Sequence, residues 1–267
     1  IDKWLPTALP SANVRSIVKD KNGHLWLGVW GGRVLKAEGR EHIIQQPRLS
    51  EYVNPFVSCL LVDSKNKLWI GTIDGITVYD LNTEIIKSIR SIDGLSDNDI
   101  TCIFEDSKGK IWVGTKQKGI TTIEGNKYTV LSKDQGLTYS NITSIAEDKN
   151  GKIWIGTEGG GAFVYENSKF NKYKVSDGLL SDFVTLVTVD EKNNVWFGTN
   201  KGLSKYDQTK KQFFSYQKND GFTGIETKPK AVYTDAQKNI WFGTVNGVFK
   251  YSPSLDNDVT PEPALHI

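Results

Sequence analysis

One short phrase recurs six times along the chain and limits its fold more than any other feature. Each copy has an aspartate, a polar turn, an aliphatic residue, a tryptophan, a second aliphatic or aromatic residue and a glycine. The tryptophans, spaced 43, 43, 42, 42 and 45 residues apart, are Trp26, Trp69, Trp112, Trp154, Trp196 and Trp241. A nearly constant period of this length is typical of repeat architectures, in which each copy forms one supersecondary unit.

The copy at residues 96–139 shows what one repeat builds. Apolar, β-prone stretches alternate with turns rich in Asp, Gly and Asn, so the sequence predicts four short strands joined by tight hairpins. The predicted strands are Ile100–Glu105, Lys110–Gly114, Ile120–Glu124 and Tyr128–Leu131. No segment shows a sustained 3.6-residue apolar period, so we expect almost no helix.

A four-stranded unit of about 40 residues is typical of one blade of a β-propeller. A single blade cannot bury both faces of its sheet, whereas a ring of blades can, because each sheet packs on its neighbours. We expect the repeated tryptophan to fill the space between blades. The glycine two residues later removes a side chain where a neighbouring strand must approach closely.

Six tryptophan phrases predict an all-β fold, a single six-bladed propeller over residues 1–252. We expect Ile1–Leu5 to form the fourth strand of the last blade and so close the ring, because the sixth copy supplies three strands before a Pro- and Asp-containing tail. An edge strand left unpaired would invite aggregation. A seven-bladed ring with one degenerate blade is the alternative. Residues 253–267 are predicted to be a linker and the start of a further domain.

The composition limits the classes of partner. A net charge of +2 and interspersed charges do not favour a nucleic-acid partner. No apolar stretch is long enough to span a membrane, and a start in mid-pattern at Ile1 suggests a mature protein or an excised domain. Cys59 and Cys102 occupy equivalent positions on adjacent predicted strands, which should stand too far apart for a disulfide. We therefore expect two buried free thiols.

The sequence offers no convincing catalytic constellation. His24, His42 and His266 are scattered, and repeat geometry does not predict that they converge on a metal or a nucleophile. The turns that begin at Asp20 and Asp148 resemble the start of a calcium loop but lack its further acidic positions. We therefore predict no catalytic residue, no metal site and no cofactor.

Binding residues are expected on the loops, where the six copies differ from one another. The loop after the second strand is unusual in the first copy and, with three glycines, in the fourth. The predicted ligand-binding residues are Trp30, Arg33, Asn54, Phe56, Asn98, Tyr139, Glu158, Asp182 and Lys228. The same loops also contain Arg15, Tyr52, Asn141 and Phe183. Aromatic, amide and charged side chains together suit a polar, ring-bearing ligand such as a sugar; the alternative is that the aromatic rings fill gaps between blades.

The repeats also resemble a known family. Residues 93–115 read DGLSDNDITCIFEDSKGKIWVGT, which is similar to the two-component regulator propeller repeat of the form GLxxNxVxxIxxDxxGxxWxGTxxGL. The same form recurs from Gly136, Gly178 and Gly221. Val259–Ile267 resembles the beginning of the small immunoglobulin-like domain that follows such propellers.

The resemblance implies a function. Such propellers are periplasmic sensor regions of hybrid two-component histidine kinases, common in Bacteroidetes, and the better understood members respond to oligosaccharides. It implies an oligosaccharide or other small polar ligand and a homodimer formed through the full receptor, with membrane attachment only through segments outside this chain. The family often carries two seven-bladed propellers, whereas this chain has six copies of the phrase. Because the shared motif is structural, no binding residue transfers from it.

Three functions therefore stand at this point. The favoured one is a non-enzymatic sensor that binds a ligand through its loops. The second is a platform for protein–protein interaction in the cell envelope. The third is a lyase, since some bacterial propellers with related short repeats are antibiotic-inactivating lyases, and it would require a histidine and a metal-binding carboxylate on one face.

Overall fold

A computed structural model describes residues 13–38, 42–45, 49, 51–224, 226–253 and 265–266. The strands of these residues form six four-stranded antiparallel sheets, one for each copy of the tryptophan phrase. The chain is thus an all-β, six-bladed β-propeller, as predicted. It divides into two compact units, Ile1–Leu131 and Ser132–Ile267, with three blades in each.

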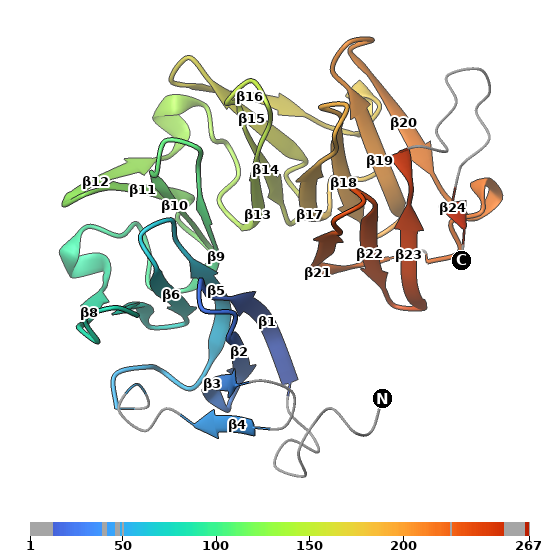
Figure 1. Cartoon of the computed structure of the whole chain (residues 1–267). Helices are drawn as coiled ribbons and strands as arrows, with labels where there is room; N and C mark the ends of the chain where they lie inside the picture. The colour runs from blue at the N-terminus through green and yellow to red at the C-terminus, as the bar shows by residue number, and fades with distance from the viewer. Residues whose placement is uncertain are drawn as a thin grey trace. The chain divides into compact units, whose positions relative to one another are not determined.

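The first unit holds the first three blades (Figure 1). The strands of blade 1 are β1 (Asn13–Lys19), β2 (Leu25–Trp30), β3 (Arg33–Glu38) and β4 (His42–Gln45). Those of blade 2 are β5 (Val57–Val62), β6 (Lys67–Thr72), β7 (Gly75–Asp80) and β8 (Ile86–Ile89). Those of blade 3 are β9 (Ile100–Glu105), β10 (Ile111–Thr115), β11 (Ile120–Glu124) and β12 (Lys127–Leu131).

The second unit repeats this order in three further blades (Figure 1). The strands of blade 4 are β13 (Ile142–Glu147), β14 (Ile153–Thr157), β15 (Ala162–Glu166) and β16 (Lys169–Tyr173). Those of blade 5 are β17 (Val184–Val189), β18 (Val195–Thr199), β19 (Gly202–Asp207) and β20 (Gln212–Tyr216). Those of blade 6 are β21 (Thr227–Thr234), β22 (Ile240–Thr244), β23 (Gly247–Tyr251) and β24 (Leu265–His266).

The strands predicted for blade 3 are confirmed to within one residue at each end. Helical structure in the described part of the chain is confined to short elements. The 3-10 turns that follow the fourth strand of a blade are η1 (Ser91–Asp93), η2 (Lys133–Gln135), η3 (Val175–Asp177) and η4 (Lys218–Asp220). Each ends at a glycine with positive φ, for example Gly94 at 119°, which is the left-handed conformation that glycine adopts at least cost.

The last blade ends differently from the prediction. Its outer strand is β24, which pairs antiparallel with β23 through Lys250 and His266. The sequence predicts Ile1–Leu5 in that position; those five residues lie outside the described part of the chain. A third strand with a free edge offers unpaired N–H and C=O groups to any extended segment that reaches it, and here residues after the sixth copy reach it. That a further domain begins within residues 253–267 stays a prediction.

Within each unit, neighbouring blades pack through their first strands. β1, β5 and β9 follow one another in the first unit, as β13, β17 and β21 do in the second. The phrase tryptophan lies between blades, as predicted: Trp26 packs with Val57 and Leu60 of the next blade and Trp154 with Val184. Both indoles are 2% exposed.

The glycine of the phrase also has its predicted role. A Cβ on Gly28 would come within 2.8 Å of Val57 Cγ1, and a Cβ on Gly156 within 2.7 Å of Val184 Cγ1. In both cases the close neighbour belongs to the first strand of the next blade. The predicted free thiols are likewise confirmed, since Cys59 and Cys102 are buried and unbonded to each other.

The aspartate of the phrase binds both the tryptophan and the hairpin turn. In all six copies the tryptophan Nε1 donates to Oδ2 of the aspartate six residues earlier, at 2.8–3.0 Å. Oδ1 of the same carboxylate accepts backbone N–H groups of the hairpin turn, as Asp20 does from Asn22 and His24 at 2.9 Å. One carboxylate thus closes the turn and satisfies the buried indole.

Candidate ligand-binding site

The predicted binding loops lie where the second strand of a blade ends. In five copies a threonine ends that strand, and its Oγ1 donates to a glycine carbonyl of the loop at 2.6–3.0 Å. The first copy has Val29 at this position and cannot form the bond. Gly31 N–H donates to the carbonyl of Pro55, at the start of the next blade, as Gly75 N–H does to the carbonyl of Asn98. The first loop therefore differs from the other five in lacking the threonine bond.

Trp30 and Phe56 come together at this unusual loop. Trp30 ends β2, Phe56 immediately precedes β5, and their backbones form an isolated antiparallel bridge. Their ring centroids are 5.2 Å apart with planes tilted by 57°. The two side chains are 37% and 38% exposed, and the Arg15 guanidinium lies 5.2 Å from the Trp30 ring centroid. We call Arg15, Trp30, Asn54 and Phe56 the first aromatic cluster.

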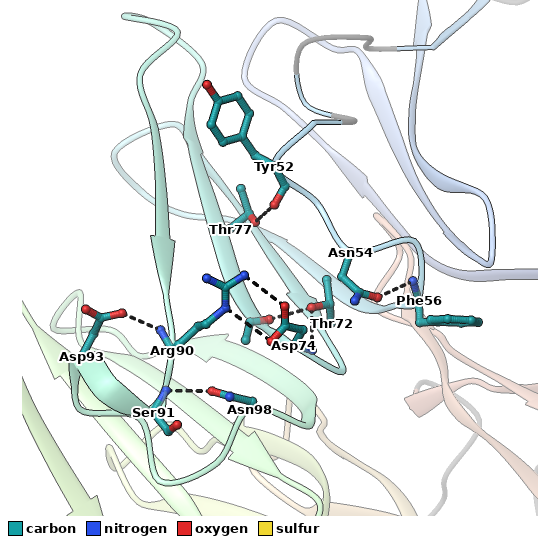
Figure 2. Close-up of polar contacts among 11 residues, drawn as sticks. Tyr52, Asn54, Phe56, Thr72, Asp74, Thr77, Arg90, Ser91, Asp93 and Asn98 are labelled. Carbon is teal, nitrogen blue, oxygen red and sulfur yellow. Dashed lines mark hydrogen bonds and ion pairs between the residues drawn. The ribbon is translucent and has the colours of Figure 1, made fainter.

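Local hydrogen bonds hold the loop that carries Phe56. Asn54 Oδ1 accepts from the backbone N–H of Phe56 at 3.0 Å (Figure 2). The carbonyl of Tyr52 accepts from Thr77 Oγ1 at 3.2 Å. A side-chain oxygen that binds the backbone two residues later is a common turn device, so the backbone around Phe56 is fixed and the ring remains half-exposed.

A second set of predicted residues meets in the second unit. Glu158 follows β14, Phe183 precedes β17, and the two form an antiparallel bridge at the repeat position of Trp30 and Phe56. Asn141 Nδ2 donates to Glu158 Oε2 at 2.8 Å. A Cβ on Gly159 would lie 3.0 Å from Tyr139 Oη and 3.6 Å from the Phe183 ring, so the glycine loop lies between these two rings. We call Tyr139, Asn141, Glu158, Asp182 and Phe183 the second aromatic cluster.

Asn98 and Asp182 occupy equivalent positions and hold loops in the same way. Asn98 Oδ1 accepts from Ser91 N–H at 2.7 Å, beside the Asp74–Arg90 ion pair (Figure 2). Asp182 Oδ1 accepts from Val175 N–H at 3.0 Å. These side-chain oxygens already have a structural bond, and a ligand role for them stays a prediction.

The remaining predicted residues stand apart from the clusters. Lys228 is exposed near the start of β21. Arg33 is the first residue of β3 and pairs with Val29; its side chain is not among the described parts. Of the cluster members, Arg15, Asn141 and Phe183 were recognised as loop residues but not as site residues. The available signal was repeat alignment, since the residues 13 before the tryptophans include both Phe56 and Phe183.

The titratable groups of the described residues do not gather into a metal site. No group of three or more His, Cys, Asp or Glu side chains is placed to hold a metal ion among them. Directly before β9, burial raises the pKa of Asp99, and Lys116, whose Nζ is 3.8 Å from its Oδ2, opposes that rise. The two clusters offer exposed rings, amides and charged groups, which can bind a ligand.

Sequence comparison identifies the repeats. Residues 8–31, 51–74, 94–117 and 136–159 match the two-component regulator propeller. The chain carries two-component regulator propeller repeats. This confirms the resemblance drawn from the phrase, and the match covers the first four copies. No curated protein matches the sequence.

Extracellular domains of two-component systems are found among the similar solved structures. The extracellular domain of the hybrid two component system BT3049 from B. thetaiotaomicron has a TM-score of 0.81 and 25% identity; the alignment covers 90% of this chain. It covers 34% of that extracellular domain, so this chain spans about a third of the domain's length.

Two further structures share the fold. Virginiamycin B lyase from Staphylococcus aureus has a TM-score of 0.71 at 13% identity, with 90% of this chain and 81% of that chain covered. PorZ, a surface component of the type-IX secretion system of Porphyromonas gingivalis, has a TM-score of 0.67 at 17% identity, with 90% and 38% covered. Identities this low establish the propeller fold and nothing about activity. Among the residues that the structure describes, no helix has the length and hydropathy needed to cross a bilayer.

Proposed function

We propose that this regulator propeller is a non-enzymatic ligand sensor from the extracytoplasmic, periplasmic part of a two-component receptor of the inner membrane. Two findings support the proposal: the regulator repeats, and the likeness over 90% of the chain to the extracellular domain of a hybrid two component system. The loops that differ between copies carry exposed rings on a scaffold that the shared phrase makes rigid. Such loops on a rigid frame are where binding residues concentrate.

The ligand that fits the first aromatic cluster best is an oligosaccharide. The observation that carries this choice is the exposed Trp30–Phe56 pair, since a soluble protein exposes an indole ring at a strand end only at a cost in hydration. An aromatic face packs well against the C–H face of a sugar ring, while nearby polar groups bind its hydroxyls. Asn54 and Arg15 stand beside the two rings to supply such bonds.

The second aromatic cluster has matching chemistry. Glu158 is exposed and can accept from sugar hydroxyls, and Tyr139 and Phe183 are 37% and 50% exposed. Signalling requires that the ligand bind two states of the receptor with different affinity. A sugar chain held by the loops would meet this condition if the arrangement of the propeller and the rest of the receptor changes on binding.

A binding experiment on the purified chain tests the proposal. We expect a thermal-shift screen to find an oligosaccharide that raises the melting temperature, and calorimetry to give a Kd for it. Trp30→Ala should weaken that Kd at least about tenfold, which is about 1.4 kcal/mol. Tyr233→Ala is the matched control, because Tyr233 is an exposed ring, 66% accessible, that belongs to neither cluster.

Two outcomes would count against the proposal. If Trp30→Ala and Tyr233→Ala bind the oligosaccharide equally well, the first aromatic cluster is not the site. A second result would be that no oligosaccharide shifts the melting temperature and the full receptor instead binds an envelope protein through this propeller. The propeller would then be a platform for protein–protein interaction and not a sensor of small ligands.

A further inference from the structure

Arg15 stands at a special position of its strand. The register of β1 and β2 shifts between Val14 and Ser16, so Arg15 is the extra residue of a β-bulge. The same shift occurs in blades 2 to 5. The residues at the corresponding bulges are Ser58, Thr101, Thr143 and Thr185. A bulge re-aims one side chain and is often found next to a functional site.

In blades 2 to 5 this position carries a hydroxyl, which has a structural bond in Ser58, Thr143 and Thr185; in blade 6 the residue is Lys230. Thr143 Oγ1 donates to the carbonyl of Val184 in the next blade at 2.7 Å. Ser58 Oγ donates in the same way to Ile100. Blade 1 replaces the small hydroxyl with the long, exposed cation Arg15, whose guanidinium lies over Trp30. Blade 1 therefore has no hydroxyl here to bond to the next blade, and it has a positive charge beside an exposed ring.

The acidic side chains Asp74 and Asp99, in the loops of blades 2 and 3, have partners other than Arg15. Asp74 pairs with Arg90 at 3.0 Å, and Asp99 pairs with Lys116 at 3.8 Å. None of the ion pairs between described residues includes Arg15. A guanidinium that stacks on an aromatic face keeps its N–H groups in the plane, where they can bind a carboxylate through two parallel hydrogen bonds.

We infer that Arg15 makes the first aromatic cluster selective for acidic oligosaccharides, in which a sugar ring carries a carboxylate. The ring would stack on Trp30 and Phe56, and its carboxylate would pair with the Arg15 guanidinium. This inference rests on the proposed function, because it names the class of sugar that the same site binds. Arg15 is then a specificity-determining residue, because a neutral sugar has no negative group to pair with its guanidinium.

The test uses matched pairs of oligosaccharides that differ only in charge, such as galacturonate trimers and their methyl esters. We expect calorimetry to show an acidic member bound at least about tenfold more tightly than its neutral counterpart, with the difference falling as salt rises from about 0.05 to about 0.5 M. Arg15→Gln should remove that preference, so that the acidic and neutral members bind the variant with Kd values within about twofold of each other. Arg15→Lys should retain part of it, since an ammonium keeps the charge but not the fork.

The possible failures are distinct. If the neutral member binds as tightly as the acidic one, or if Arg15→Gln keeps the preference, the role of Arg15 is wrong while oligosaccharide sensing stands. If neither member of any pair binds, the proposed function fails together with the inference. Circular dichroism and the melting temperature of Arg15→Gln verify that the variant is folded, so a lost preference cannot come from unfolding.

Discussion

Nε1 of Trp112 donates to Oδ2 of Asp106 at 2.9 Å, and this bond joins two residues that are present in all six copies of the phrase. Oδ1 of Asp106 accepts from the backbone N–H groups of Lys108 and Lys110 at 3.0 and 2.9 Å. The indole is 3% exposed, so no water can easily replace the carboxylate as its partner. The turn and the core are therefore fixed by one side chain.

Replacing Asp106 should cost more than a surface substitution. Asp106→Ala leaves the buried indole N–H without an acceptor and removes two bonds that close the turn, so we expect a loss of about 2–3 kcal/mol in the free energy of unfolding. Asp106→Asn should cost less, because its amide oxygen can still accept from the turn. Urea unfolding measures both, with Asp134→Ala in an exposed turn as control; equal midpoints for Asp106→Ala and the control would contradict the role of the bond.

Truncation of a buried tryptophan should cost much more stability than truncation of the exposed Trp30. Trp112→Ala removes a buried ring between blades and should lower the free energy of unfolding by about 3–5 kcal/mol. Trp30→Ala removes a ring that is 37% exposed and should change stability by less than about 1 kcal/mol. Melting curves of both variants check this. A fall for Trp30→Ala as large as that for Trp112→Ala would make Trp30 part of the core and remove it from the proposed site.

The close approach at Gly156 predicts an energetic coupling between blades. Gly156→Ala would place its Cβ 2.7 Å from Val184 Cγ1 in the next blade, and overpacking of this kind costs about 1–3 kcal/mol. Val184→Ala removes the clashing methyl groups at its own cavity cost. The double variant should lose less free energy of unfolding than the sum of the two single-variant losses, by about 1 kcal/mol. Strict additivity in urea unfolding would show that the clash is relieved elsewhere.

Stability should fall in acid because of two carboxylates of the phrase, Asp20 and Asp235. Burial acts to raise the pKa of Asp20, but bonds from the Trp26 indole and from His24 lower it more, so its pKa lies below the usual 3.8. A carboxyl whose pKa is lower in the folded state stabilises the fold above the unfolded pKa, and that contribution is lost as pH falls through the folded pKa.

We therefore expect the melting temperature to drop as pH falls below about 4, and to drop less steeply in Asp20→Asn, which has no charge to lose. Scanning calorimetry between about pH 6 and pH 3 measures both slopes. Identical slopes in the two proteins would mean that Asp20 titrates alike in the folded and unfolded chains. We expect the same direction for Asp235, because hydrogen bonds from Asn239 and Trp241 lower its pKa.

Prediction from the sequence went furthest for residues that every copy shares. The position of β9, the inter-blade place of Trp26 and the close approach at Gly156 follow from periodicity, because each repeat must solve the same packing problem. The sequence did not predict which side chain each of these residues contacts. That Asp20 binds Trp26, and that Asn98 holds a loop, depends on the folded hairpins that bring those atoms together.

The candidate site shows the same division more sharply. By itself the sequence determined the six-bladed, four-stranded architecture, since the spacing of apolar residues and turns admits little else. Only the tertiary structure decided that Trp30 meets Phe56, that Glu158 meets Phe183, and that Arg15 lies over Trp30. Trp30 and Phe56, like Glu158 and Phe183, come from successive copies and meet because one blade packs on the next. Arg15 and Trp30 lie on two paired strands of blade 1. No local pattern specifies either kind of contact.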